Sequence, residues 1–405
     1  MPLYRRAVEA RERILGPEHP HTLSSLNNLA VLLYEKGDYA AAEPLYRRAL
    51  EVMERILGPE HPSTLVSLNN LANLLKNKGD DDAAEPLYRR TLEAKERILG
   101  PEHPDTLRSL NNLAALLSGK GDYAAAEPLY RRALEAKERI LGPEHPDTLS
   151  SVNNLANLLS NKGDYAAAEP LYRRALETRE RILGPEHPST LTSVVNLAIL
   201  LIDKGDYAAA EPLSRRALEA RERILGPEHP DTLTRLNNLA NLLKDKGDDD
   251  GAEPLYRRAL EAEERILGPE HPDTLRSLNN LAILLKDKGD YDAAEPLYRR
   301  ALEVRERILG PEHPDTLTSL NNLGLLLYKQ GDYAGAVALL KAHAAKSEAC
   351  LAYVRYHLAC YECLSGNLAE AKRLIAEEIA ADPEKKEQAL EDDDLKAIRK
   401  FIQRL

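Results

Sequence analysis

The sequence predicts an all-α solenoid, in which antiparallel helix hairpins stack along one axis. The pentapeptide GPEHP occurs eight times, always 42 residues apart. A fixed period of this size indicates one supersecondary unit copied in tandem, each copy burying its apolar face on its neighbours. Leucine and alanine recur at helical spacing in every copy, and the sequence lacks strand-like alternation. The pentapeptide begins at Gly16, Gly58, Gly100, Gly142, Gly184, Gly226, Gly268 and Gly310.

The first helix of a copy is predicted from an apolar stripe, for which residues 64–103 serve as the example. Its members recur every three or four residues, as one face of a helix requires. Gly79 ends this helix, because glycine readily adopts the left-handed conformation of a C-cap, and Asp80 suits the N-cap of the next helix. The stripe consists of Leu65, Leu68, Leu71, Ala72, Leu74 and Leu75.

The second helix is predicted from about Asp82 to Leu99, where a Gly-Pro pair ends it. Pro86 lies one turn inside this helix and removes one backbone donor, so we expect a slight bend there. Pro104 then suits the first position of the next helix. The predicted apolar face of the second helix consists of Ala84, Leu87, Tyr88, Leu92, Ile98 and Leu99.

The pattern LNNLAxLLxxKGDYxxAEPLYRRALE resembles the tetratricopeptide repeat. The long second helix ending in ILGPEHPDT resembles the 42-residue version found in the cargo-binding domain of kinesin light chains and in related bacterial proteins. The resemblance implies a right-handed superhelix of helix hairpins. A kinesin light chain also has a heptad coiled coil, and nothing in this sequence resembles one, so we do not infer a motor subunit.

The two ends of the array depart from the repeat. Residues 2–6 align with residues 44–48, so the chain opens on the second helix of a copy, and we expect either a truncated longer polypeptide or an edge covered by a partner or a second copy. The last residues form a charged segment with Leu395, Ile398, Phe401 and Ile402 on one face, which predicts a capping helix. The predicted parts are a truncated half repeat at 1–20, eight repeats of the 42-residue type at 21–346, a ninth repeat of the 34-residue type at 347–383 and the capping helix at 384–405.

Composition narrows the classes of function. The 405 residues include 55 Lys and Arg and 66 Asp and Glu, a formal charge of -11, which repels nucleic acid and anionic membranes. No apolar run approaches the roughly 18 residues of a membrane span, and three clustered cysteines fit a reducing compartment. We therefore expect a cytoplasmic protein that binds neither nucleic acid nor membranes.

Catalytic and metal-binding motifs are not found. The sequence lacks the GxxxxGK[ST], GxSxG and HExxH patterns, so we expect no enzyme activity and no cofactor. One histidine per copy is too widely spaced to share a metal ion, and a turn residue before proline is the preferred interpretation. We interpret Cys350, Cys360 and Cys363 as buried small residues and the runs of three aspartates as solvated helix starts, so no metal site is expected. The histidines are His19, His61, His103, His145, His187, His229, His271 and His313.

Comparison of the copies identifies a stripe on the first helix whose residues vary, beside a repeated asparagine. The resemblance implies that this stripe lines a concave groove, where its Asn, Lys and Arg residues contact a bound peptide. Alternatively, the asparagines hydrogen-bond to the adjacent hairpin and hold the stack together. In the fifth copy Ile199 and Ile202 predict an apolar anchor. The candidate groove residues are Asn28, Asn70, Asn73, Lys76, Arg108, Asn112, Asn154, Asn157, Asn196, Ile199, Ile202, Asn238, Asn241, Lys244, Arg276, Asn280 and Asn322.

The sequence is consistent with three alternative functions. The first is a non-catalytic adaptor or scaffold that binds a peptide segment of a partner protein in the groove. The second is the sensor or regulatory arm of a larger signalling NTPase or protease, truncated at its N-terminus. The third is a scaffold that self-associates through its uncapped N-terminal edge.

Overall fold

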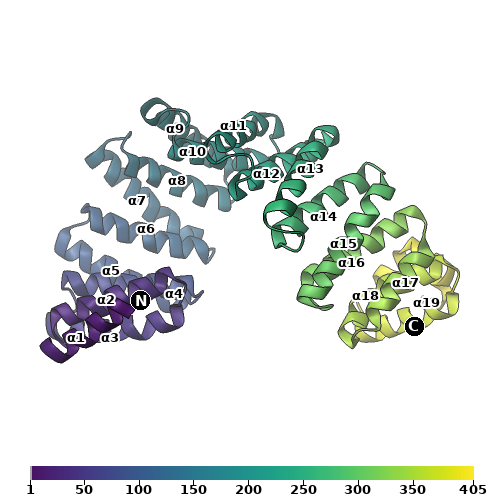
Figure 1. The fold of residues 1–405 in the computed structure, drawn as a ribbon, viewed down its shortest axis with the longest axis horizontal. Helices are drawn as coiled ribbons and strands as arrows, with labels where there is room; N and C mark the ends of the chain where they lie inside the picture. The colour runs from purple at the N-terminus through teal and green to yellow at the C-terminus, as the bar shows by residue number, and fades with distance from the viewer. Residues whose placement is uncertain (1) are drawn as a thin grey trace. The chain divides into compact units, whose positions relative to one another are not determined.

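The computed structural model describes residues 2–405 as a succession of helices, with no strand among them (Figure 1). The helices are α1 Pro2–Leu15, α2 Pro20–Glu35, α3 Tyr39–Leu57, α4 Pro62–Asn77, α5 Asp81–Leu99, α6 Pro104–Gly119, α7 Tyr123–Leu141, α8 Pro146–Asn161, α9 Tyr165–Leu183, α10 Pro188–Asp203, α11 Tyr207–Leu225, α12 Pro230–Lys246, α13 Asp249–Ile266, α14 Pro272–Asp287, α15 Tyr291–Leu309, α16 Pro314–Gln330, α17 Tyr333–Ala344, α18 Glu348–Leu364, α19 Leu368–Ala381, α20 Lys385–Glu391, the 3-10 helix η1 Asp393–Ile398 and α21 Arg399–Ile402.

The chain divides into two compact units, Met1–Leu200 and Leu201–Leu405, with the boundary inside α10. Within each unit consecutive helices pack on one another as hairpins, for example α6 on α7 in the first unit and α14 on α15 in the second. Each hairpin also packs on the next, as α5 does on α6 and α15 on α16. The prediction of an all-α array of stacked helix hairpins is confirmed.

The GPEHP turn supplies the cap of each first helix. The Nδ1 atom of His61 accepts a hydrogen bond from the Ser63 backbone N–H at 3.2 Å, and Pro62 occupies the first helical position. All eight histidines accept the equivalent bond two residues on. Asp80 caps the second helix in the same way, accepting from the Ala83 N–H at 3.2 Å. The histidines are thus helix caps, in line with the expected turn role.

The core of most copies consists of the first-helix stripe and a tyrosine from the second helix, a position held by Ser214 in the fifth copy and Leu340 in the eighth. Leu68 and Ala72 are fully buried, and Tyr88 is 1 % exposed. The predicted apolar face of the second helix is wrong at its end, since Ile98 is 45 % and Leu99 40 % exposed. Ala94, one turn earlier on the face of Ile98, is buried, so the last turn of α5 extends beyond the helices that cover it.

The C-terminal segment is not the single capping helix that was predicted. It forms α20, η1 and α21, because the backbone is extended at Asp392, whose side chain accepts from the Asp394 N–H at 2.9 Å. The predicted apolar residues still turn inward, and Leu395, Ile398 and Ile402 are at most 1 % exposed. The segment packs on α18 and α19 and covers this end of the second unit.

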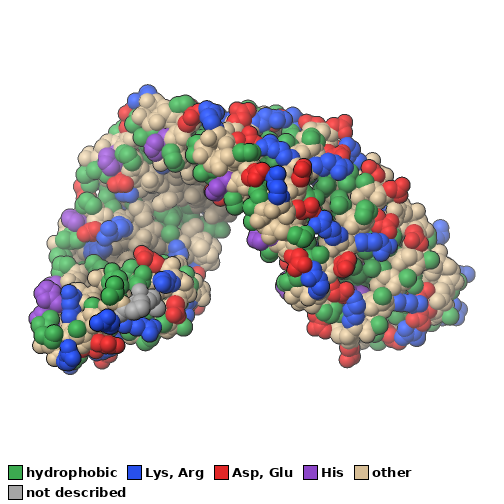
Figure 2. Space-filling model, viewed as in Figure 1, with side chains coloured by type: hydrophobic (Ala, Val, Ile, Leu, Met, Phe, Trp, Pro, Cys, Tyr) green, Lys and Arg blue, Asp and Glu red, His purple; other side chains and the backbone are tan. Residues whose placement is uncertain are grey.

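Ion pairs connect neighbouring copies along their outer surface. Lys120 Nζ lies 2.9 Å from an oxygen of Glu85, and Arg132 lies 2.6 Å from Glu96 in the preceding copy. The same two pairs recur in both units, as Lys288 with Glu253 and Arg300 with Glu264. Because basic and acidic side chains pair in this way, they are interspersed on the face in Figure 2 and not gathered by sign. Such partly exposed pairs contribute about 0 to 1 kcal/mol each.

A buried cation forms a second link between copies. Lys95 is 6 % exposed, and its Nζ donates to Ser109 Oγ on the first helix of the next copy at 3.0 Å. Arg179 is equally buried and donates to Ser193 Oγ at 2.7 Å. Burial lowers the pKa of both cations. The sequence signal for this link is the Lys or Arg that directly precedes the ERIL segment in most copies.

Glu263 reverses the charge of this link in one copy. The residue is 2 % exposed and accepts from Asn237 Nδ2 at 3.1 Å, while its Oε2 has no hydrogen-bond partner among the described residues. Burial therefore raises the pKa of the Glu263 carboxyl above its ordinary value. A raised carboxyl pKa favours the protonated form in the folded state, so this stabilisation is present at acidic pH and is lost as pH rises through the folded-state pKa.

We predict that Glu263→Gln stabilises the protein at neutral pH by about 1 to 2 kcal/mol, because the amide removes a buried charge. The gain shrinks towards about pH 4, where the wild-type carboxyl is protonated. Urea unfolding at about pH 4 and pH 7 measures both values. Glu261→Gln, on the exposed side of the same helix, is the control and changes little at either pH. A gain of equal size at both pH values would contradict the assignment.

Candidate functional site

The variable stripe lies on the solvent side of the first helices, a surface that we call the A face. It is formed by α2, α4, α6 and α8 in the first unit and by α12, α14 and α16 in the second. On α4 Val66 is exposed and Asn73 and Lys76 are half-buried, whereas the leucines of the opposite side are buried. Each first helix therefore separates a constant core side from a variable solvent side.

The repeated asparagines link adjacent first helices at several positions. Asn112 Nδ2 donates to Asn69 Oδ1 at 3.1 Å, and Asn322 donates to Asn279 at 2.9 Å. Asn280 approaches Asn241 Oδ1 at 3.5 Å. These contacts give Asn112, Asn280 and Asn322 the structural role that was one of the two alternatives. Asn28 and Asn238 are exposed on the A face, and Asn70, Asn154 and Asn196 are half-buried.

A second set of candidate asparagines contacts the core. Tyr88 Oη donates to Asn73 Oδ1 at 2.5 Å, from the second helix of the same hairpin. Asn157 and Asn241 accept the equivalent bond from Tyr172 and Tyr256. The amide oxygen that we expected to contact a ligand is thus engaged by a buried hydroxyl. Elsewhere the corresponding position is apolar, as Val31, Ala115, Ile283 and Leu325.

The candidate cations have carboxylates beside them. Arg108 lies 2.9 Å from Asp105, with more than half of its side chain exposed. Arg276 repeats this pair with Asp273 at 2.9 Å, and Lys244 lies 3.4 Å from Asp287. Exposed pairs of this kind are weak, so an acidic ligand can compete for the cation. Arg108 also borders a cavity of about 280 Å³ together with Asn111, Lys137, Ile140 and Leu141.

The predicted apolar anchor remains a prediction. Ile199 and Ile202 both lie on α10, where Ile199 is 48 % exposed and Ile202 half-buried. The boundary between the two units falls between them.

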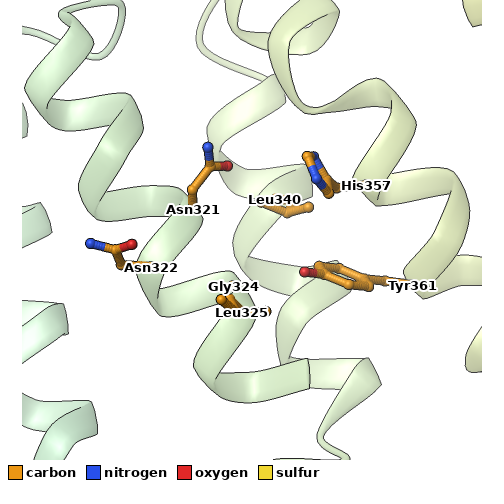
Figure 3. Close-up of a pocket in the computed structure, with 7 residues that line it drawn as sticks. All are labelled: Asn321, Asn322, Gly324, Leu325, Leu340, His357 and Tyr361. Atoms are coloured by element: carbon orange, nitrogen blue, oxygen red, sulfur yellow. The ribbon is translucent and has the colours of Figure 1, made fainter. Parts of the chain in front are cut away.

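A cavity that sequence reasoning missed lies between α16, α17 and α18. It measures about 190 Å³ (Figure 3). Gly324 and Leu340 line it where earlier copies have alanine and, in all but one, tyrosine, so the departure from the repeat was its only sequence signal. Burial lowers the pKa of His357, outweighing the opposite effect of Asp392. The lining residues are Asn321, Asn322, Gly324, Leu325, Leu340, His357 and Tyr361.

Cys360 and two aspartates lie close enough to be considered as metal ligands. Their ligand atoms all lie within 4.8 Å of one another. Tyr356 Oη donates to Asp392 at 3.0 Å, and Tyr328 Oη donates to Asp394 at 3.0 Å. These tyrosines satisfy the carboxylates and attach the C-terminal segment to α16 and α18. We therefore assign this group a structural role.

The stacked hairpins, the repeated turn and the variable A face together define an α-solenoid of the interaction type. Models described as tetratricopeptide repeat match residues 2–55, 27–97, 68–139, 148–189, 190–262, 236–305 and 278–349. The chain belongs to the tetratricopeptide repeat family, as the sequence predicted. A search of curated proteins gave no match.

Several solved structures are similar to the chain. A kinesin light chain candidate from Podosopora anserina with nearly identical TPR-like repeats is 27% identical over 51% of this chain and 98% of its own, with a TM-score of 0.48. BtubC (BKLC) from P. vanneervenii is 26% identical over 55% of this chain and 89% of its own, with a TM-score of 0.46.

A signal transduction ATPase with numerous domains (STAND) and a tetratricopeptide repeat sensor, from Pyrococcus horikoshii, has a TM-score of 0.55. The two sequences are 15% identical, and the match covers 89% of this chain and 55% of the ATPase. This chain thus spans about half the length of that protein. This likeness shows the fold alone. Among residues 2–405 no helix has the length and apolar character needed to cross a bilayer.

We predict that Asn73→Ala costs about 1 kcal/mol of unfolding free energy, because the Tyr88 hydroxyl loses its partner in the core. In a double-mutant cycle with Tyr88→Phe, the two changes couple by about 0.5 to 1.5 kcal/mol. Asn28→Ala, at an exposed position of α2, is the control and changes stability by less than about 0.5 kcal/mol. Chemical unfolding measures all four variants. Equal losses for Asn73→Ala and Asn28→Ala would show that Asn73 is not tied to the core.

Proposed function

We propose that the chain is a non-catalytic interaction scaffold that binds a peptide segment of a partner protein along the A face. One observation carries the proposal: the copies differ mainly on this face, while the groups that join them recur. The Glu85 to Lys120 pair has counterparts in both units, whereas Val66, Arg108 and Ser150 occupy one position in three consecutive copies. A surface whose exposed positions differ between copies presents different chemistry to each part of an extended ligand.

The geometry supports an extended ligand. First helices of neighbouring copies contact one another, as the Asn69 to Asn112 bond shows. Packed helices lie about 8 to 10 Å apart, and an extended chain rises about 3.3 Å per residue, so about three ligand residues correspond to one copy. Arg108, Arg276 and Lys244 favour acidic residues in the ligand, and the exposed amides suit its backbone.

A second candidate function is the sensor arm of a larger signalling NTPase. The similarity in fold to the repeat-containing STAND protein favours this candidate, because that protein combines such repeats with an ATPase. A sensor arm also binds its ligand on the repeats, so this candidate shares the A face with the first. The nucleotide sequence upstream of Met1 decides between them: an open reading frame that encodes an NTPase domain supports the arm, and an in-frame stop codon contradicts it.

We predict that a peptide selected from a proteome-derived library by the full chain binds at least about tenfold more weakly to the double variant Arg108→Ala, Asn154→Ala. Arg131→Ala is the matched control, since Arg131 is about half-exposed on the second helix α7. That control binds the same peptide within about twofold of wild type. Fluorescence anisotropy measures all three affinities. An equal loss in the control, or no selective peptide at all, would contradict peptide binding on the A face.

A further inference from the structure

Gly324 is a buried residue of α16 beside Leu325 on the A face, and it leaves a space that a side chain could occupy. Eight of the nine copies have a buried alanine at this position, and only the eighth copy has glycine. Glycine in a helix interior is less stable than alanine. A Cβ at Gly324 would lie 3.9 Å from Leu340 and 3.9 Å from Tyr361, which is ordinary contact, so alanine would fit. The glycine therefore weakens the helix and leaves a small volume unfilled. The alanines are Ala30, Ala72, Ala114, Ala156, Ala198, Ala240, Ala282 and Ala359.

The unfilled volume is part of the cavity of about 190 Å³ in Figure 3. Gly324 and Leu325 on α16 form one wall, and Leu340 on α17 lies behind them. His357 and Tyr361 project from α18 towards α16. The cavity is widened at a second position, because Leu340 stands where the two preceding copies have a tyrosine.

The lining selects an uncharged, ring-shaped group. No Asp, Glu, Lys or Arg lines the cavity, so a charged side chain would find no oppositely charged partner on its walls. Leu325 and Leu340 are aliphatic, and the rings of His357 and Tyr361 have centroids 6.5 Å apart. An apolar cavity of about 150 Å³ is large enough to hold benzene. A phenyl ring therefore fits this space and gains ring contacts with α18.

The cavity is continuous with the repeated asparagines. Counted from the glycine that ends each first helix, His357 occupies the position of Asn322 in the ninth copy. Asn322 lines the cavity while its Nδ2 donates to Asn279 in the preceding copy. Asn321 also lines it and donates to Tyr353 Oη on α18 at 2.5 Å. A peptide that follows the asparagines along α14 and α16 reaches the mouth of this cavity.

We propose that the cavity is the anchor pocket for one phenylalanine side chain of the bound peptide. This inference rests on the proposed function, and it names the residue that the C-terminal end of the A face selects. Leu325, Leu340 and Tyr361 surround the phenyl ring, and Asn321 and His357 lie at the side where the peptide backbone passes.

The test uses N-acetyl-phenylalanine methylamide as the probe and the full chain with labelled leucine methyl groups. Titration is expected to shift the methyl resonances of Leu325 and Leu340, and the alanine analogue to leave them unchanged. Gly324→Ala fills the floor of the pocket and is expected to weaken binding at least tenfold, while the melting temperature stays equal or rises. Gly119→Ala is the matched control, since Gly119 is helical and a Cβ there meets nothing within 4 Å. This control binds the probe as wild type does.

Two results would overturn the pocket: equal binding of the probe to the Gly324→Ala and wild-type chains, or equal binding of the leucine and phenylalanine analogues. The peptide selected on the A face separates this inference from the proposed function. If Arg276→Ala, on α14 of the same unit, weakens binding of a selected peptide while Gly324→Ala leaves its affinity unchanged, the pocket is wrong and the scaffold stands. If the library yields no selective peptide, but the probe binds the wild-type chain and does not bind Gly324→Ala, the pocket stands and the scaffold is wrong.

Discussion

Burial of one copy against the next is the constraint on which every other feature depends. A single hairpin cannot cover Leu68, Ala72 and Tyr88 by itself, and these side chains are buried because adjacent helices pack on them. Because each copy packs on the next, the polar contacts also run between neighbouring copies. The buried link from Lys95 to Ser109 and the outer pairs such as Glu85 with Lys120 all connect a copy to its neighbour. The histidine cap fixes where each first helix starts, so successive copies enter the stack in the same register.

The same constraint leaves one surface free to vary. Most core and linking positions repeat, because a change there disturbs two copies at once, and Glu263 is an exception. Exposed positions of the A face are not held constant in this way. At one of them, for example, different copies have valine, arginine, serine or threonine. The departure at Gly324 goes further, since it removes a methyl group from the edge of the core and opens a cavity on that face. In the proposed function, specificity arises at such positions, where the repeat is broken.

The fold was predictable because its signals lie in the linear sequence. The 42-residue period, the leucine stripe and the positions of Gly and Pro can be read without knowing which helices pack on one another. What the sequence of one copy does not show is the environment that a neighbouring helix sets. Ile98 continues the apolar face but extends beyond the helices that cover it, and the hydrogen bond from the Tyr88 hydroxyl to Asn73 is visible only once the two helices are packed together. The pocket at Gly324 requires three helices, so only the structure brings its residues together.

Deletion of residues 142–183, one complete period, tests most directly whether the copies are stacked modules. The junction joins Leu141 to Gly184, which reproduces the natural sequence at that turn. Circular dichroism and urea unfolding of the shortened chain measure the outcome. Nearest-neighbour stacking predicts a soluble protein with the same helical content per residue and a cooperative transition. An insoluble or largely unfolded product would contradict the account, because it would mean that the copies depend on contacts beyond their immediate neighbours.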